Sequence, residues 1–236
     1  MSRRPDPAAG VFDTLLVQGG APVALDDHLA RLAASVRALY DVALDVGAIR
    51  GEVTAVAAGA PLQRVRIDVV PGDEPSVTAT PLAARPRTPW HLVLRRLPGG
   101  WGDHKWRDRS GLDAPGDPST DPLLIDEHDL LLETGRGNVF VVRDEAVATP
   151  PLDGRILPGI TRADVLGILD RLGIDAVERP ITLTELTEAD EVFASGSISG
   201  VRPVATCDVA GPWPVGPLTR AVDDALERAW VADAED

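Results

Sequence analysis

The chain has 236 residues, 44% of them hydrophobic, which is enough to bury a core in one large domain or two lobes. A formal net charge of −14 argues against binding to nucleic acid or to an anionic membrane, and no apolar run approaches the ~20 residues of a membrane span. The single cysteine, Cys207, excludes an internal disulfide and a thiolate metal cluster, so we expect a cytoplasmic protein held together by packing.

The N-terminal part of the chain predicts an α+β lobe. In chain order we expect a strand at 11–17, helices at 29–40 and 46–56, and strands at 65–70 and 76–81. Asp26 and Asp27 precede the first helix and are its expected caps. We therefore place residues 1–84 in a small N-terminal lobe.

The proline-rich stretch 83–89 has the composition of a connector, and residues 85–236 are expected to form a larger lobe. Apolar runs in this part predict strands at 91–97, 123–126, 130–133, 138–142, 146–149 and 191–195. Helical spacing predicts helices at 161–172, 183–189 and 218–231. The stretch 110–122 contains too many Gly and Pro residues for a helix, so we expect a loop there.

Basic residues give the most informative feature of the composition. Of the 23 Lys and Arg residues, only Lys105 is a lysine. A coding bias that favours arginine would replace lysine wherever a positive charge alone suffices. Arginine cannot, however, supply a primary amine that loses its proton and forms an imine. Lys105 is therefore a candidate catalytic amine, and a surface lysine retained by chance is the alternative.

Two further segments have the chemistry of a pyridoxal-phosphate site. Pro158-Gly159-Ile160-Thr161 begins a helix, where free amides of Ile160 and Thr161 and the Thr161 hydroxyl suit a phosphate; an ordinary helix cap is the alternative. Glu133 ends an apolar strand beside a Gly-rich turn and is a candidate partner for the pyridine nitrogen, unless it is a solvated turn acid.

The hydroxyl-rich turn Ser195–Gly200 follows a predicted strand and is a third candidate part of the phosphate site, through Ser197. It does not match the hydrolase Gly-x-Ser-x-Gly pattern, because Ile198 stands where the serine belongs. The four histidines show no metal-ligand spacing, so we expect no metal.

The order of these segments resembles the fold-type IV pyridoxal-phosphate enzymes, the class IV aminotransferases and their lyase relatives. The resemblance rests on Gly10–Leu15, His28–Leu32, Glu133–Phe140, Leu157–Arg162 and Ala189–Ser197. It implies an α/β (α+β) fold of two lobes with the cofactor between them, and a homodimer in which a partner loop closes the pocket. It also implies that Lys105 forms the Schiff base and that Arg31 binds the cofactor phosphate.

The reaction is less closely defined by the sequence. The Tyr-x-Arg-Pro-Leu strand of branched-chain aminotransferases is absent, and Thr14, Arg107 and Asp108 look more like the substrate side of the lyases. The resemblance favours 4-amino-4-deoxychorismate lyase, which forms 4-aminobenzoate in the folate pathway. A transaminase on a D-amino acid or a branched-chain amino acid and a non-catalytic cofactor-binding homologue are the alternatives. Arg107 and Arg136 are candidate binders of a substrate carboxylate.

Overall fold

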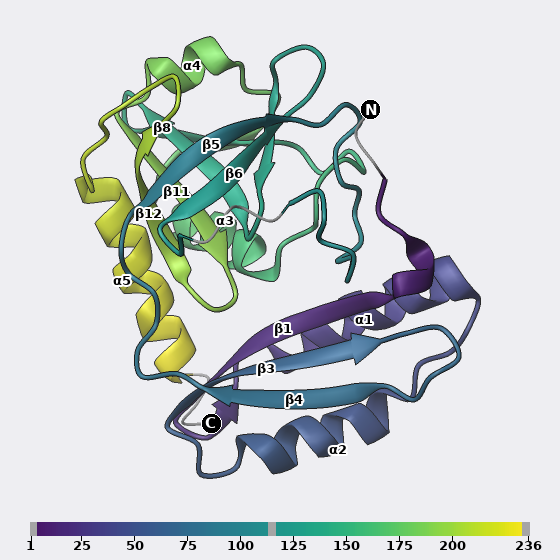
Figure 1. Cartoon of the computed structure of the whole chain (residues 1–236). Coiled ribbons are helices and arrows are strands. Elements are labelled where there is room, and N and C mark those ends of the chain that lie inside the picture. The colour runs from purple at the N-terminus through teal and green to yellow at the C-terminus, as the bar shows by residue number, and fades with distance from the viewer. Residues whose placement is uncertain (1–3, 113–116, 233–236) are drawn as a thin grey trace. The chain divides into compact units, whose positions relative to one another are not determined.

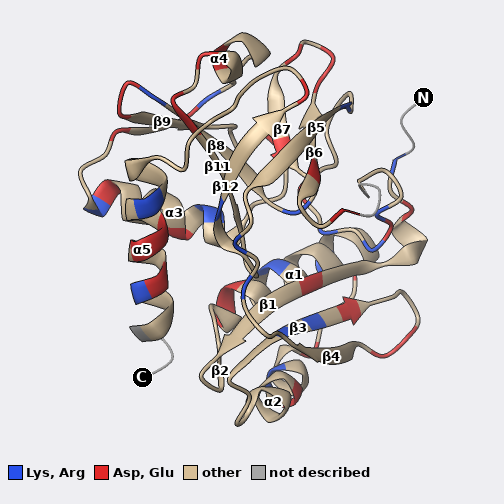
Figure 2. Cartoon of the chain, turned by 60° about the vertical axis from the view of Figure 1, so that its left-hand side comes forward, with Lys and Arg blue, Asp and Glu red and all other residues tan. Residues whose placement is uncertain are grey.

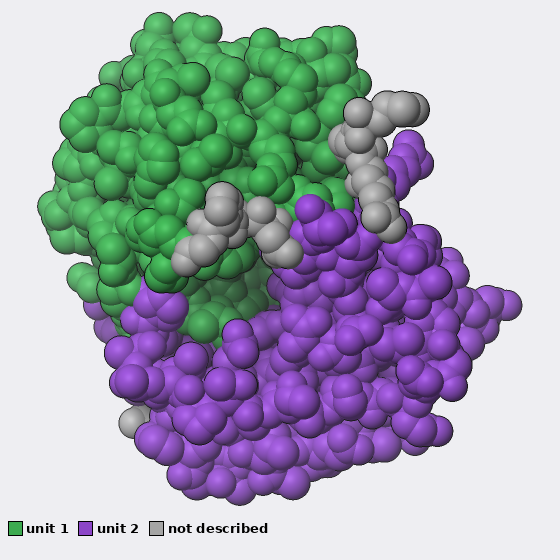
Figure 3. Space-filling view, viewed as in Figure 1, with its two compact units in different colours: residues 1–3, 87–103, 111–227 green, residues 4–86, 104–110, 228–236 purple. Residues whose placement is uncertain are grey.

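The computed structural model describes residues 4–112 and 117–232, which divide into two compact units (Figure 3). Of the described residues, unit 1 contains 87–103, 111–112 and 117–227, and unit 2 contains 4–86, 104–110 and 228–232. Both contain helices and strands, which confirms the predicted mixed α/β class. The lobe boundary at residue 84 stays a prediction. Residues 113–116, which belong to the predicted loop 110–122, lie outside the described residues, as do residues 1–3 and 233–236. Within the described ranges, no helix has the length and apolar character needed to cross a bilayer.

Unit 2 is built on an antiparallel sheet in the order β2-β1-β3-β4, which follows a short 3₁₀ helix, η1 (Pro7–Ala9) (Figure 1). The strands are β1 (Val11–Gln18), β2 (Ala21–Pro22), β3 (Leu62–Val69) and β4 (Ser76–Pro81). The pairing of Phe12 with Asp68 and of Thr14 with Arg66 sets the register of β1 on β3. Because side chains alternate along a strand, these four residues share one face of the sheet.

The two helices of this unit are α1 (Leu25–Tyr40) and α2 (Val46–Ala57), which pack on the sheet and on each other. The expected capping of α1 by Asp26 and Asp27 is wrong: the N-cap is Ala24, whose φ of 49° is left-handed, and no side chain caps the helix. The two aspartates lie in the first turn, where their charges favour the positive end of the helix dipole.

The segment that carries Lys105 lies along the free edge of β1. The amide of Phe12 donates to the Lys105 carbonyl over 2.9 Å, and the amide of Arg107 donates to the Gly10 carbonyl over 3.0 Å. Val11 and Trp106 form the bridge between these two bonds. Residues 105–107 therefore act as a short extra strand, which places the Lys105 side chain on the Phe12 face of the sheet.

Unit 1 contains an eight-stranded sheet in the order β10-β9-β8-β11-β12-β5-β6-β7. Its strands are β5 (Trp90–Arg96), β6 (Thr120–Ile125), β7 (Leu131–Thr134), β8 (Asn138–Arg143), β9 (Ala146–Thr149), β10 (Ala176–Glu178), β11 (Glu191–Gly196) and β12 (Gly200–Cys207). Val139, Val141, Val192 and Ala194 belong to one buried cluster. Phe140 and Phe193 point to the opposite face and are also buried, so both faces of β8 and β11 are covered.

Three helices complete the unit: α3 (Ile160–Arg171), α4 (Leu183–Thr187) and α5 (Pro217–Ala232). The chain from residue 228 onward, the end of α5, groups with unit 2. Basic and acidic residues both occur along α5 (Figure 2). The buried Glu191 accepts hydrogen bonds from the amides of Leu218 and Thr219 and from the Thr219 hydroxyl, which caps the start of α5.

Candidate active site

Lys105 lies in a cluster of positive groups around one phenyl ring in unit 2. Its Nζ is 5.4 Å from the centroid of the Phe12 ring, the Arg109 guanidinium carbon is 5.9 Å away and that of Arg66 is 3.8 Å away. Cations are attracted to the face of an aromatic ring, which favours the grouping of these three side chains around Phe12. The lysine is partly buried, so its amine lies in a cationic, partly apolar environment.

Asp68 supplies negative charge at the border of this cluster. It accepts hydrogen bonds of 2.7 Å from Arg66 and 2.6 Å from Arg107. Burial alone would raise the pKa of Asp68, but the bonds from these two arginines lower it below its usual value. Asp68 thus remains an anion, and it fixes two of the arginines on the Lys105 face of the sheet.

The predicted substrate residues Thr14, Arg107 and Asp108 all lie in unit 2. Thr14 shares the Phe12 face of β1 and is partly exposed. Arg107 donates to Asp68 and to the Ala9 carbonyl, and Asp108 accepts from the amide of Asp6 and from Ser110. The last two residues therefore have structural partners, and a role toward a substrate stays a prediction for all three.

Arg31, the predicted phosphate binder, projects from α1 toward the buried carboxylate of Asp13. Its Nε lies 3.0 Å from Asp13 Oδ2, and its Nη2 lies 2.8 and 2.9 Å from the two carboxylate oxygens. His28, one turn earlier on α1, places Nδ1 2.8 Å from Asp13 Oδ1. Burial by itself would raise the pKa of Asp13, but Arg31 and His28 outweigh it and hold the pKa well below its ordinary value.

We predict that Asp13 makes the fold acid-sensitive. A carboxyl whose pKa is lower in the folded than in the unfolded chain contributes stability above its unfolded pKa of about 4, and this is lost as the pH falls toward its folded pKa. The stability difference between the parent and Asp13→Asn should therefore shrink below pH 4, by at most about 1.4 kcal/mol per pH unit. Urea unfolding over a pH series measures it, and a difference independent of pH would contradict the prediction.

In unit 1, the start of α3 has the properties of an anion site. The N-cap is Gly159, so no side chain accepts a hydrogen bond from the first amides of the helix. A Cβ on Gly159 would lie 2.0 Å from the Asn138 amide oxygen, so a larger residue here would have to displace the Asn138 side chain. The predicted residues Ile160 and Thr161 are the first two of the helix, and Thr161 is buried. The amides and the hydroxyl are therefore grouped at the positive end of the helix dipole.

Glu133 is buried at the end of β7 and reaches the segment that leads into α3. Its Oε2 accepts a hydrogen bond of 3.2 Å from the Leu157 amide, and Asn138 donates to the Leu157 carbonyl over 3.0 Å. These two bonds connect the β7–β8 turn to residue 157, three residues before α3. A carboxylate and a helix N-terminus are thus held in the same part of unit 1.

The β11–β12 hairpin lies against the same turn. A Cβ on Gly137 would lie 2.1 Å from the Ser195 carbonyl oxygen, so the two backbones are in close contact. Ser197 is partly buried at the tip of the hairpin. The Ser195 hydroxyl is fully buried and has no hydrogen-bond partner among the described residues. Buried hydroxyls are nearly always hydrogen-bonded, and none of the described residues supplies the partner for this one.

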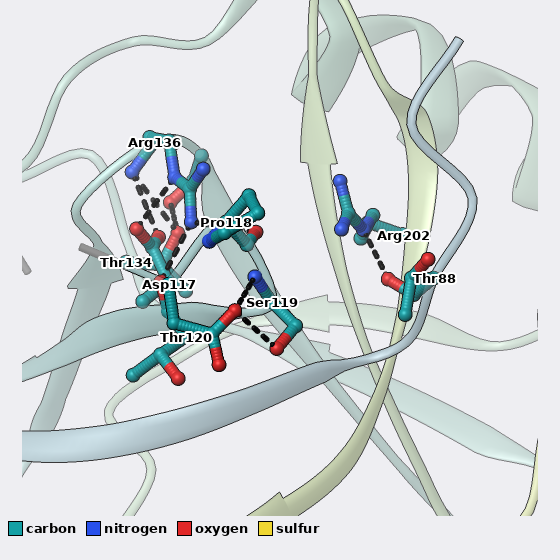
Figure 4. A network of polar contacts seen from close by, with 10 residues as sticks. Thr88, Asp117, Pro118, Ser119, Thr120, Thr134, Arg136 and Arg202 are labelled. Atoms are coloured by element: carbon teal, nitrogen blue, oxygen red, sulfur yellow. Dashed lines mark hydrogen bonds and ion pairs between the residues drawn. The ribbon is translucent and has the colours of Figure 1, made fainter. Parts of the chain in front are cut away.

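Arg136, a candidate for carboxylate binding, is engaged by neighbouring groups (Figure 4). Its Nε donates to Asp121 over 2.7 Å and its Nη2 to the Thr120 carbonyl over 2.7 Å. Burial raises the pKa of Asp121 more than Arg136 lowers it. The guanidinium carbons of Arg136 and of the buried Arg202 each lie 4.9 Å from the centroid of the Trp90 ring. Burial, followed by the charge of Arg136, lowers the pKa of Arg202.

Each unit by itself carries groups whose chemistry suits a phosphate-bearing aldehyde cofactor. In unit 1, Glu133 bonds the segment that leads to Ile160 and Thr161, and the β11–β12 hairpin with Ser195 and Ser197 lies against the β7–β8 turn. Unit 2 groups the primary amine of Lys105 with Thr14, Arg107 and the cationic cluster, and holds Arg31 on α1. Among residues 4–112 and 117–232, no group of three His, Cys, Asp or Glu side chains is arranged to hold a metal ion.

Sequence reasoning missed the residues that surround the predicted ones. Asp13, His28, Phe12, Arg66 and Arg109 were not predicted as parts of the site. The spacing of His28 and Arg31 on one helix face and the buried position of Asp13 in an apolar strand were the available signals. The identity of their partners depends on how α1 crosses β1, which the sequence pattern leaves open.

Comparison with known sequences gives a family match over most of the chain. A family model described as amino-transferase class IV matches residues 10–207. The branched-chain-amino-acid aminotransferase-like protein 2 of Arabidopsis thaliana is 36% identical over 110 residues, which are 46% of this chain and 20% of that protein. The matched stretch is thus a fifth of that relative.

Solved structures match over a larger share. A 4-amino-4-deoxychorismate lyase from Pseudomonas aeruginosa has a TM-score of 0.75 and 27% identity, and the match covers 97% of this chain and 94% of the lyase. A branched-chain aminotransferase from Thermoproteus uzoniensis, solved with norvaline, has a TM-score of 0.80 and 24% identity, over 96% of this chain and 86% of that one. At 24% identity, the likeness to the Thermoproteus aminotransferase shows a shared fold.

Proposed function

Because the chain belongs to the class IV aminotransferase family of pyridoxal-phosphate enzymes, we propose that it is a 4-amino-4-deoxychorismate lyase that works through Lys105. The fold-type IV architecture expected from the sequence is confirmed by the likenesses to solved structures. The observation that carries the proposal is the only lysine of the chain, held on the edge of β1 inside a cationic cluster.

We propose that the residues singled out in the sequence bind pyridoxal phosphate. Glu133 would pair with its pyridine nitrogen, and Arg31, the Ile160 and Thr161 amides, the Thr161 hydroxyl and Ser197 would bind its phosphate. When bound, the cofactor supplies an aldehyde that condenses with amines and a ring that accepts negative charge. The buried position of Glu133 and the uncapped start of α3 support these roles.

In this proposal Lys105 moves the proton at the carbon that bears the substrate amine. Loss of that proton allows the neighbouring carbon–oxygen bond to break, so that enolpyruvate leaves, takes up a proton and becomes pyruvate. The ring that remains becomes the aromatic 4-aminobenzoate. Arg66 and Arg109, near the same phenyl ring as Lys105, suit the carboxylates of such a substrate.

The match to the Pseudomonas lyase supports the lyase reaction, because it covers almost all of both chains. The missing Tyr-x-Arg-Pro-Leu strand also supports it. A transaminase is the second candidate, favoured by the identity with the Arabidopsis branched-chain aminotransferase-like protein. Such an enzyme would act on a D-amino acid or a branched-chain amino acid.

Product analysis separates these functions. We expect the purified protein with pyridoxal phosphate to form 4-aminobenzoate and pyruvate in equal amounts from aminodeoxychorismate, with no added keto acid. Incubation with leucine or D-alanine plus 2-oxoglutarate should give little glutamate. The reverse result would establish the transaminase instead of the lyase. A colourless protein that takes up no cofactor would overturn both.

The homodimer implied by the family resemblance is also part of the proposal. Light scattering coupled to size-exclusion chromatography is expected to give twice the chain mass of 24.9 kDa. A monomer that turns over at the full rate would remove the partner loop from the proposed site.

A further inference from the structure

The carboxylate of Asp13 is the most completely surrounded charge in unit 2. The residue is 1% exposed, and it accepts hydrogen bonds from His28, from Arg31 and from the amide of Thr14. An ionised carboxylate only accepts hydrogen bonds, so the Nδ1 of His28 must carry a proton toward it. Two residues one turn apart on α1 are thus fixed to one point of β1.

The contact with Asp13 neutralises the charge of Arg31 and also fixes the orientation of its guanidinium. Its Nε and Nη2 both donate to the same carboxylate, at 3.0 and 2.8 Å, which fixes the plane of the guanidinium. A planar guanidinium that is held along one edge by a carboxylate has a fixed orientation. An arginine without this partner would sample several rotamers before it bound an anion.

Phe12, the residue before Asp13 in β1, contacts Lys105 as Asp13 contacts Arg31. The amide of Phe12 donates to the Lys105 carbonyl over 2.9 Å, and its ring lies 5.4 Å from the lysine Nζ. Consecutive residues of one strand therefore hold the amine and the arginine, from opposite faces of the sheet. A strand is a rigid spacer between the two groups, which loops would not provide.

We propose that Asp13 is a positioning residue, which orients Arg31 for the phosphate of the cofactor while Phe12 orients the Lys105 segment. This inference rests on the proposed function, because it takes the roles of Arg31 and Lys105 from it. Asp13 itself touches neither the cofactor nor the substrate. Its contribution is the direction of the Arg31 guanidinium.

The test compares the dissociation constants of pyridoxal phosphate and of pyridoxal, which lacks the phosphate. Asp13→Asn keeps the shape of the side chain and removes its charge. We expect it to weaken pyridoxal phosphate binding by about 10- to 100-fold, the effect found for residues that orient a ligating group. Binding of pyridoxal should change by less than about 3-fold, whereas a general loss of structure would weaken both ligands equally.

Two further variants make the test specific. Arg31→Gln should lose the preference for the phosphorylated ligand. The double variant Asp13→Asn with Arg31→Gln should bind pyridoxal phosphate as well as Arg31→Gln alone, because both changes remove the same interaction. Asp126→Asn is the matched control in unit 1, because Asp126 is equally buried and holds Arg155 at 2.6 Å. It should leave the preference unchanged.

The outcomes separate this inference from the proposed function. If Arg31→Gln keeps the preference for pyridoxal phosphate, the role proposed for Arg31 is wrong and the inference falls with it. If Arg31→Gln loses the preference for pyridoxal phosphate and Asp13→Asn keeps that preference, only the inference is overturned. Should Asp13→Asn fail to fold, Asp13→Glu keeps the charge but displaces it by one methylene group. A full preference for the phosphorylated ligand in that variant would also overturn the inference.

Discussion

Replacing Lys105 by alanine is expected to abolish covalent attachment of pyridoxal phosphate and to lower kcat by at least about 10²- to 10⁴-fold, the range that one positioned acid–base group contributes. No other side chain of the protein carries a primary amine, because the remaining 22 basic residues among Lys and Arg are arginines. A neighbouring lysine therefore cannot take over the role.

Borohydride reduction followed by mass spectrometry measures this directly. The parent should carry one reduced cofactor on the peptide that contains Lys105, and Lys105→Ala should carry none. Lys105→Arg is the matched control: it keeps the positive charge near Phe12 but has no amine to condense, so it should behave like alanine. A small added amine should restore part of the turnover in Lys105→Ala. Label at another position, or unchanged turnover, would refute the assignment.

Phe140→Ala is expected to destabilise the fold by about 3–5 kcal/mol, the usual cost of removing a buried phenyl ring. Phe140 is fully buried on β8 and stacks on Phe193 of β11, with ring centroids 4.9 Å apart and planes 5° from parallel. These residues pair directly across the two strands, so the substitution leaves a cavity and removes an aromatic contact.

Urea unfolding of the parent and the variant measures the free energy of unfolding. Val42→Ala is the control, because Val42 is 54% exposed and its substitution should change stability by less than about 0.5 kcal/mol. Phe193→Ala should cost a similar amount, and the double variant less than the sum, since the two rings contact each other. A loss below about 1 kcal/mol for Phe140→Ala would mean that the site collapses around the cavity.

Apolar periodicity predicted most of the fold, because the buried stripes of α1, α3 and α5 and the alternation of β1 and β3 are properties of the local sequence. The strand β12 was not predicted, since it begins at Gly200 and contains Pro203, and both residues reduce strand propensity. Its pairing with β11 and β5 compensates for them. The three-residue strand β10 was also not predicted, and its pairing with β9 stabilises it.

The sequence predicted those candidate residues whose type or position in the sequence is unusual. It did not predict the residues whose role depends on how helices and strands pack. Lys105 was found because it is the only lysine, and Ile160 and Thr161 because they follow a glycine before an apolar helix. The Asp13 clamp on Arg31 joins residues 18 positions apart, and which helix residue meets a strand residue depends on packing. The partners of Arg107 and Arg136 were hidden for the same reason.

The short pairing of residues 105–107 with β1 also limits how this protein can be divided. The chain runs from unit 2 into unit 1 after residue 86, returns for residues 104–110, and leaves again. A recombinant fragment that ends at residue 86 would lack Lys105 and would expose the backbone of β1 at Gly10 and Phe12. Exposed edges of this kind recruit other strands, so such a fragment is expected to self-associate instead of serving as a minimal domain.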